Sequence, residues 1–186
     1  MMDAMTTFPK ARRSQQGYDI EQVEDFLEDA RRAYATDLRT ETAIDSAAIR
    51  RTSFSMQKGG YSPAHVDAAL ERLEEAFARR EHERGILEHG EEAWFGRIRD
   101  QASSVRERLR QPDGARFRRV SRISRGYRIA EVDRFAQRLA AYLDDGPDVT
   151  PREVRTARFE AQFGGYDEDE VDALLDDVVA LMLAVR

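Results

Sequence analysis

The sequence predicts an all-α protein built from four short modules, each an extended loop, a Gly-Tyr turn and a helix. The Gly-Tyr pair recurs at Gly17-Tyr18, Gly60-Tyr61, Gly126-Tyr127 and Gly165-Tyr166. Five residues after each tyrosine stands a valine that is followed by an acid: Val23-Glu24, Val66-Asp67, Val132-Asp133 and Val171-Asp172. Apolar residues recur eight, nine and twelve positions after each tyrosine. With the valine they have the i, i+3, i+4, i+7 spacing of one helix face.

We expect the valine stripe of each helix to be buried and the acid after each valine to face solvent. Three of the four helix starts carry capping signals: Asp19 with Gln22, Asp167 with Glu170, and Ser62 followed by Pro63. The glycine is expected to permit positive φ and close backbone approach in a sharp turn. The tyrosine ring is expected to pack beneath that turn.

The modules are of two kinds in A-B-A-B order. Phenylalanine stands nine residues before the glycine in the first and third modules, and six before it in the second and fourth. This order indicates duplication of an A-B unit. It predicts two repeat pairs: residues 1–90, with modules near 8–39 and 44–80, and residues 112–186, with modules near 117–143 and 149–186.

Residues 91–111 between the pairs are predicted to form a connecting helix. Its apolar stripe consists of Trp94, Ile98, Ala102, Val105 and Leu109. The helical pattern already begins near residue 65, so it predicts one long helix or two helices joined near Gly85 or Gly90. All helices are expected to pack as hairpins or as a bundle.

Composition favours a cytoplasmic binding protein over an enzyme. The net charge is −6, which argues against nucleic acid as the main partner, and cysteine is absent. No run approaches the ~20 apolar residues of a membrane span, and the start has no secretion signal. His65, His82 and His89 lack the spacing of a metal site. With no phosphate loop and no nucleophile elbow, we expect no cofactor, no metal and no catalytic residues.

Charge is nonetheless segregated. Residues 115–128 contain six arginines and no acid, whereas residues 167–177 contain seven acids and no base. Three interpretations of this arginine cluster stay open: a solvated face, pairing with acidic helices of the same or another chain, or contact with anionic lipid or nucleic acid. The candidate contact residues are Arg118, Arg119, Arg122 and Arg125.

The fourth module, with "DVTPREVRTARF" at 148–159 and Tyr-Asp-Glu-Asp-Glu-Val-Asp at 166–172, resembles the N-terminal module of DivIVA. The second module is similar apart from Ser62 in place of the acid, and the first and third are similar from the glycine onward. The resemblance to a DivIVA-domain repeat protein implies a non-enzymatic, self-associating scaffold or adaptor. It also implies bacterial cell division or polar growth, division-machinery partners, and a location at the septum or cell pole.

Typical DivIVA modules contact the membrane through a phenylalanine two residues before the glycine and an arginine beside it. The phenylalanine position is occupied here by Gln15, Lys58, Ser124 and Phe163, and the arginine position by Gln16, Gly59, Arg125 and Gly164. Phe163 and Arg125 therefore match in different modules. Phe163 is interpreted either as a membrane contact or as a core or interface residue. The long coiled coil of the family is missing, so we expect paired modules to form an intramolecular pseudo-dimer, with a homodimer as the alternative.

Overall fold

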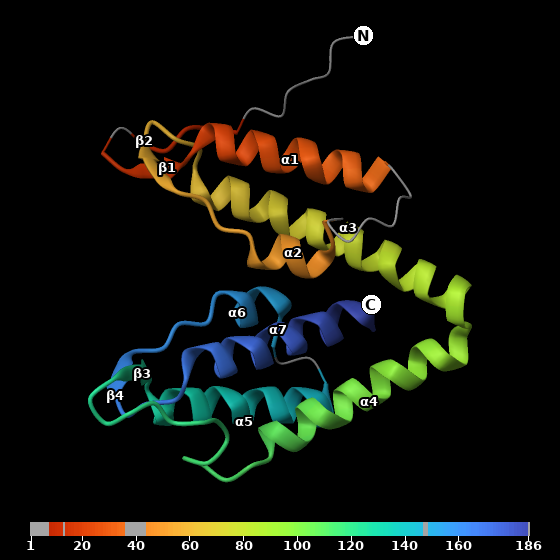
Figure 1. Ribbon diagram of the computed structural model, residues 1–186, viewed down its shortest axis with the longest axis vertical. Helices are drawn as coiled ribbons and strands as arrows, with labels where there is room; N and C mark the ends of the chain where they lie inside the picture. Colours follow the sequence, from red (N-terminus) through yellow and green to blue (C-terminus); the bar gives the residue numbers. More distant parts are fainter. Residues whose placement is uncertain (1–7, 13, 36–43, 147–148, 186) are drawn as a thin grey trace. The chain divides into compact units, whose positions relative to one another are not determined.

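The computed structural model describes residues 8–12, 14–35, 44–146 and 149–185 (Figure 1). The chain divides into two compact units, Met1–Glu81 and His82–Arg186, and each is described by itself. Helices predominate, as predicted, and each of the strands has three residues. The predicted ends of the first and fourth modules, at residues 39 and 186, lie outside the described residues.

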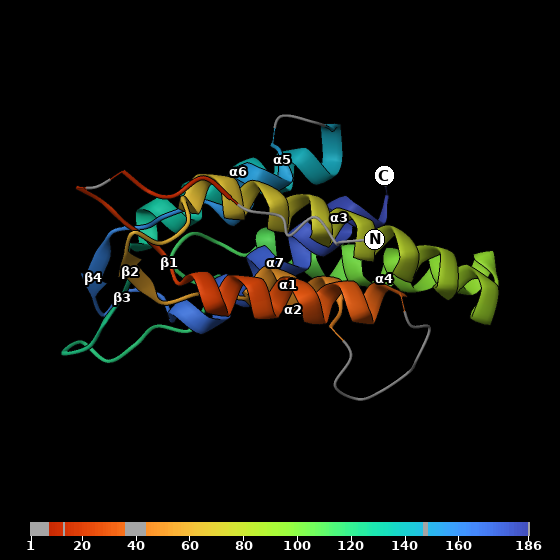
Figure 2. The same cartoon turned by 90° about the horizontal axis from the view of Figure 1, so that it is seen from above.

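Unit 1 contains two paired strands and the helices that follow them. Its elements are β1 (Gln16–Tyr18), α1 (Ile20–Ala35), α2 (Ser46–Arg51), β2 (Met56–Lys58) and the larger part of α3 (Pro63–His89). The strands β1 and β2 are antiparallel, and both views draw them side by side (Figures 1 and 2). The short helix α2 and the strands were not predicted, because three to six residues are too few to show a period.

Local sequence explains where these helices begin. The Asp19 carboxylate accepts a hydrogen bond from the Gln22 backbone N–H at 3.0 Å, and the Asp45 carboxylate accepts one from Ala48 N–H at 2.6 Å. Pro63 is the first residue of α3, where no intrahelical donor is needed. Behind these caps, Val23 and Val66 are buried together with Phe8 and Tyr61 in one core cluster.

Unit 2 repeats this plan and adds a helix. After the end of α3 come α4 (Glu91–Leu109), β3 (Arg125–Tyr127), α5 (Ile129–Asp145), α6 (Pro151–Arg155), β4 (Ala161–Phe163) and α7 (Glu168–Ala184). Strands β3 and β4 are antiparallel in the same register as β1 and β2. Thr150 caps α6 in a complete capping box with Glu153. Val132 and Val171 are buried, as their counterparts in unit 1 are.

The segment expected to connect the repeat pairs belongs to unit 2. α4 packs against both α5 and α7, and its Val105 and Leu109 are buried. The boundary between the units falls within α3, between Glu81 and His82, instead of near residue 90. The break between α3 and α4 is at Gly90, which has φ 84°, while Gly85 stays helical beneath the Trp94 ring. The amphipathic stripe of α4 thus covers a helix pair.

Candidate functional site

The four Gly-Tyr pairs come together two by two, one crossing in each unit. In unit 1 Tyr18 N–H donates to Tyr61 C=O and Tyr61 N–H donates to Tyr18 C=O, both at 2.9 Å. In unit 2 Tyr127 and Tyr166 exchange the same two hydrogen bonds, also at 2.9 Å. Each A module is therefore related to its B module by a local twofold pattern of hydrogen bonds.

Close backbone approach explains the glycines. A Cβ atom on Gly17 would lie 2.4 Å from the Tyr61 carbonyl oxygen, and one on Gly126 would lie 2.1 Å from that of Tyr166. Positive φ, the other expected reason, is found at Gly59 and Gly164, each one residue before the crossing glycine of its B module. Any side chain at the crossing would force the two strands apart.

The acid after each valine was expected to face solvent, and for Asp133 that expectation is wrong. Tyr166 OH donates to the Asp133 carboxylate at 2.9 Å, and Asp133 is 4% exposed. Tyr61 OH likewise donates to Glu24 at 2.5 Å, and Tyr127 OH to Asp172 at 3.3 Å. The acid is thus the acceptor for the tyrosine of the partner module. Because the residues come from different modules, the spacing within one module did not reveal the bond.

The pKa values of the three tyrosines and of Asp172 are raised at these contacts. The hydrogen bond to Glu24 raises the pKa of Tyr61 to about 12. Burial, reinforced by the hydrogen bond to Asp133, raises the pKa of Tyr166 to about 12. Burial and the charge of Asp172 do the same to the pKa of Tyr127, and burial raises the pKa of Asp172. All three tyrosines therefore stay protonated donors at neutral pH.

The arginines of the cluster lie in different environments, and Arg128 at its end pairs with Glu131 and Glu160. Arg116 is buried, donates to Asp133 at 2.7 Å and to Asp113 at 2.6 Å, and also bonds the Leu109 carbonyl. Arg118 pairs with Asp167 and Glu170 at the start of α7, as the interpretation of pairing with an acidic helix predicted. Arg119 donates through Nε to the Gly164 carbonyl at 3.0 Å. In the described part of the chain, no acid pairs with Arg122 or Arg125.

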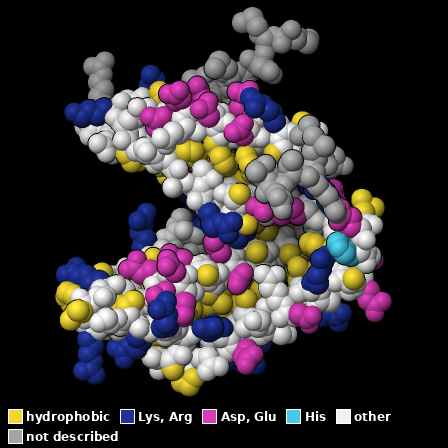
Figure 3. All heavy atoms as spheres, in the orientation of Figure 1, with side chains coloured by type: hydrophobic (Ala, Val, Ile, Leu, Met, Phe, Trp, Pro, Cys, Tyr) yellow, Lys and Arg dark blue, Asp and Glu magenta, His cyan; other side chains and the backbone are white. Residues whose placement is uncertain are grey.

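The exposed end of the β3–β4 pair combines cations with apolar side chains. Arg125 lies opposite Phe163 in the strand register, and its guanidinium carbon is 4.9 Å from the Phe163 ring centroid. Phe163 is 59% exposed and Ile123 is 87% exposed. We call Arg119, Arg122, Ile123, Arg125 and Phe163 the basic tip. Figure 3 shows hydrophobic and basic side chains together at this end of unit 2.

Two features hold the basic tip in shape. Ser124 N–H donates to Ser121 C=O at 2.8 Å and closes a turn that carries Ile123 at its corner. Gly164 N–H then donates to Ser124 C=O at 3.0 Å, which joins the turn to β4. Sequence reasoning named every residue of the tip except Ile123. The available signal was an isoleucine isolated between arginines and serines. No apolar residues stand at helical spacing around it, so it has no predicted core position.

The corresponding end of unit 1 is polar. Gln16 lies opposite Lys58 in the register that Arg125 and Phe163 share in unit 2. Aligned on the crossing glycines, Ile123 corresponds to Ser14, which is exposed. Met56, which is 48% exposed, lies at the other end of the strand pair, opposite Tyr18, where unit 2 has Ala161. The two ends therefore share a backbone and differ in chemistry.

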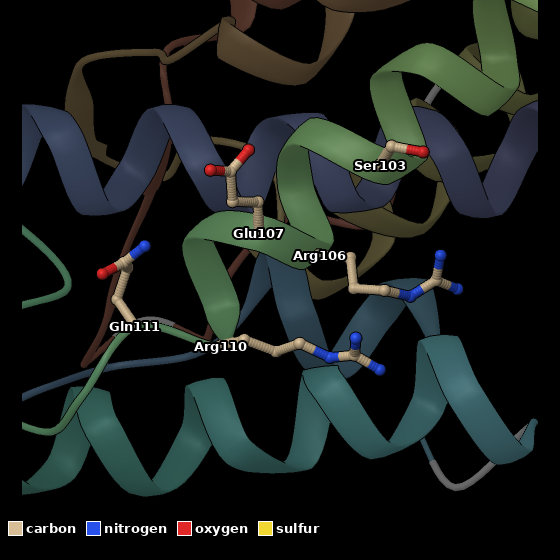
Figure 4. Close-up of a pocket in the computed structure, with 5 residues that line it drawn as sticks. All are labelled: Ser103, Arg106, Glu107, Arg110 and Gln111. Atoms are coloured by element: carbon tan, nitrogen blue, oxygen red, sulfur yellow. The ribbon is translucent and has the colours of Figure 1, made fainter.

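One cleft of about 380 Å³ lies beside the second half of α4 and is lined by Ser103, Arg106, Glu107, Arg110 and Gln111 (Figure 4). Its two arginines bond the Asp144 carboxylate, whose pKa they lower, Arg110 most. Because the Asp144 carboxylate already neutralises both arginines, the cleft is not suited to bind an anion. Among the described residues, no group of three His, Asp or Glu side chains is placed to hold a metal ion.

Comparison of the chain with protein-family models, curated proteins and solved structures gave no match. No described helix combines the length and apolarity that crossing a bilayer requires.

Proposed function

We propose that this chain is a non-enzymatic, DivIVA-like adaptor for bacterial cell division or polar growth, and that unit 2 contacts anionic membrane surface through the basic tip. The observation that carries the proposal is the juxtaposition of Phe163 with Arg125. Each of these residues matches the membrane position of the family in a different module, and the crossing of the modules puts the ring and the guanidinium 4.9 Å apart. Ile123 adds a second exposed apolar side chain beside them.

The chemistry of the tip suits a lipid interface. Burying Ile123 and Phe163 in acyl chains is worth about 1.5–3 kcal/mol each. Each arginine near an anionic surface adds about 1 kcal/mol. Part of this gain offsets the cost of association, so one tip gives a reversible contact that depends on both apolar insertion and charge. Nucleic acid would use the arginines alone, without a role for Ile123.

Vesicle co-sedimentation tests the proposal with the full chain. We expect binding to vesicles of phosphatidylglycerol and phosphatidylcholine that weakens with added salt and is absent from vesicles of phosphatidylcholine alone. Ile123→Ser with Phe163→Ser should lower the bound fraction at least tenfold. Val185→Ser, which alters a 66% exposed residue elsewhere, is the matched control and should bind normally. Unchanged binding by the double variant would refute the membrane contact, and so would tight binding to duplex DNA without vesicle binding.

Unit 1 offers a gain-of-function version of this test. Ser14→Ile, Gln16→Arg and Lys58→Phe together would give the β1–β2 end the side chains that unit 2 carries at matching positions. With two tips per chain, we expect tighter vesicle binding than for the unaltered protein. A fluorescent fusion tests the cellular part of the proposal. Enrichment at septum or poles supports it, and diffuse fluorescence contradicts it.

A further inference from the structure

The junction of α3 and α4, at residues 82–95 of unit 2, combines packed rings with exposed apolar side chains. A Cβ atom on Gly85 would lie 2.2 Å from the Trp94 ring, so glycine lets that ring pack directly on α3. The His82 ring lies 5.3 Å from the Trp94 ring and 6.2 Å from the Phe95 ring. Leu87 is nevertheless 86% exposed, and Phe95 is 39% exposed. Such exposed apolar side chains mark a contact surface when their surroundings select a partner.

The segment of chain between these two side chains is acidic. Residues 87–95, which we call the acidic hairpin end, contain Glu88, Glu91 and Glu92 and no lysine or arginine. Glu91 and Glu92 lie exposed in the first turn of α4, where they also suit the helix dipole. Arg97, one turn further on, lies over the Trp94 ring at 5.2 Å. A partner for this surface therefore offers cations next to apolar side chains.

We propose that the acidic hairpin end binds the basic tip of a second copy of this chain and so masks that tip. The tip residues 119–125 contain three arginines and no acid, and Ile123 and Phe163 are its exposed apolar residues. If two hairpin ends faced each other instead, Glu91 and Glu92 of one copy would lie against the same glutamates of the other. Repulsion between these like charges disfavours that contact. The basic tip is therefore the better partner for the acidic hairpin end, because its charge is opposite and both surfaces expose two apolar side chains.

The geometry of unit 2 makes this association directional. The α3–α4 junction and the β3–β4 pair lie at opposite ends of the unit in both views (Figures 1 and 2). Contact between different surfaces at opposite ends is heterologous and adds copies head to tail. Because few side chains take part on each side, the contact is weak and transient, below the about 1,000 Å² that a stable interface buries. When the basic tip binds a membrane, it is no longer available to the second copy, and the two copies separate. That membrane binding regulates self-association rests on the proposed function.

Sedimentation velocity over a concentration series tests the inference with the full chain. We expect the unaltered protein to self-associate at high concentration and low salt, and less at high salt. The hairpin variant, Leu87→Ser with Phe95→Ser, and the tip variant, Ile123→Ser with Phe163→Ser, should each raise the dissociation constant at least tenfold. Val185→Ser should self-associate like the unaltered protein. Failure of the unaltered protein to self-associate overturns the inference.

Mixing the variants makes the test specific. A hairpin variant keeps a tip and a tip variant keeps a hairpin end, so the mixture should form a complex that stops at two copies. Glu91→Arg with Glu92→Arg should bind a copy carrying Arg122→Glu and Arg125→Glu better than it binds itself. Mixtures that stay monomeric contradict the interface. The hairpin variant should still bind anionic vesicles, and this result separates failure of the inference from failure of the proposed membrane contact.

Discussion

Unit 1 and unit 2 share the crossing of two Gly-Tyr pairs but differ at the exposed end of the strands beside it. In both units the tyrosines exchange backbone hydrogen bonds at 2.9 Å, and a Cβ atom on either glycine would collide with the other strand. At the strand ends, Gln16 and Lys58 in unit 1 take the positions of Arg125 and Phe163 in unit 2. The crossing glycines leave no room for a side chain, whereas the strand ends beside them carry different side chains on the same backbone in the two units.

The units also differ in where they bury charge. Unit 1 buries the pair of Arg50 on α2 and Glu74 on α3, with 2.8 Å between Nε and Oε1. Aligned on the second glycines, Glu74 corresponds to Val179, which is buried in unit 2. Unit 2 instead buries Arg116 against Asp133 beside its crossing. The crossing of unit 2 therefore depends on an ion pair, and this difference can be tested against unit 1.

The largest loss of folding stability is expected when a methyl group is added at a crossing glycine. Gly126→Ala would push β3 from the Tyr166 carbonyl and break both hydrogen bonds between Tyr127 and Tyr166. Overpacking together with unpaired buried backbone groups costs on the order of 5 kcal/mol. Trp94, the only tryptophan, lies in unit 2 and reports its unfolding in denaturant. Gly17→Ala should destabilise unit 1 by a similar amount, as followed by circular dichroism.

Gly96→Ala is the control for these variants. Gly96 lies in α4, and a Cβ atom there would have no other atom within 4 Å, so alanine should stabilise the helix by about 0.5–1 kcal/mol. A denaturation midpoint for Gly126→Ala equal to that of the unaltered protein would show that close approach is not what the crossing requires.

A smaller effect is expected when the acid beside each crossing is replaced. Asp133→Ala removes one of the two carboxylates that pair with the buried Arg116 and leaves Gly114 N–H and Tyr166 OH without their acceptor, which together costs about 3 kcal/mol or more. Glu24→Gln in unit 1 removes only the charged acceptor of Tyr61 OH and should cost about 1 kcal/mol. Denaturation curves followed by Trp94 fluorescence for unit 2, and by circular dichroism for unit 1, give both values.

Replacing the whole polar group tests the reason for that difference. Arg116→Met, Asp133→Leu and Tyr166→Phe together remove the buried ion pair and the hydroxyl bonded to it, while Asp113 stays at the surface and Gly114 N–H loses its acceptor. They should recover much of the stability lost in Asp133→Ala. Equal losses for Asp133→Ala and Glu24→Gln would mean that the ion pair adds nothing to the crossing of unit 2.

Period-based reasoning predicted what lies within one helix and missed what lies between modules. Val23, Val66, Val132 and Val171 each belong to a stripe with i, i+3, i+4, i+7 spacing within one helix, so the sequence predicted their burial directly. Asp133 lies off that stripe, and its burial comes from Tyr166, 33 residues away in the chain. The strand register that brings Arg125 over Phe163 is likewise a property of two modules together.

The site shows the same division. Phe163 and Arg125 were selected one by one from the sequence, each as a partial match in its own module. Ile123 has no such match, and its exposure follows from the turn closed between Ser121 and Ser124. The packing of α4 on α5 and α7 was missed because an amphipathic stripe indicates burial without naming the surface that covers it.

High pH tests the tyrosine hydroxyls at the two crossings. The pKa of Tyr61, Tyr127 and Tyr166 is raised to about 12 in the folded chain, against about 10 when unfolded. A raised pKa means that the stabilisation is complete below about pH 10 and is lost as the pH rises through 12. Ultraviolet absorbance should show three late tyrosinates, and circular dichroism should show unfolding over the same range.

Glu24→Gln then distinguishes the units. The hydrogen bond to Glu24 is the main reason for the high pKa of Tyr61, so the variant should ionise Tyr61 at lower pH. Burial is the main reason for Tyr166, so Asp133→Asn should move the pKa of Tyr166 less. Equal shifts in the two variants would mean that one cause acts at both crossings. A tyrosine titration complete near pH 10 with the fold intact would mean that neither crossing holds its hydroxyls as described.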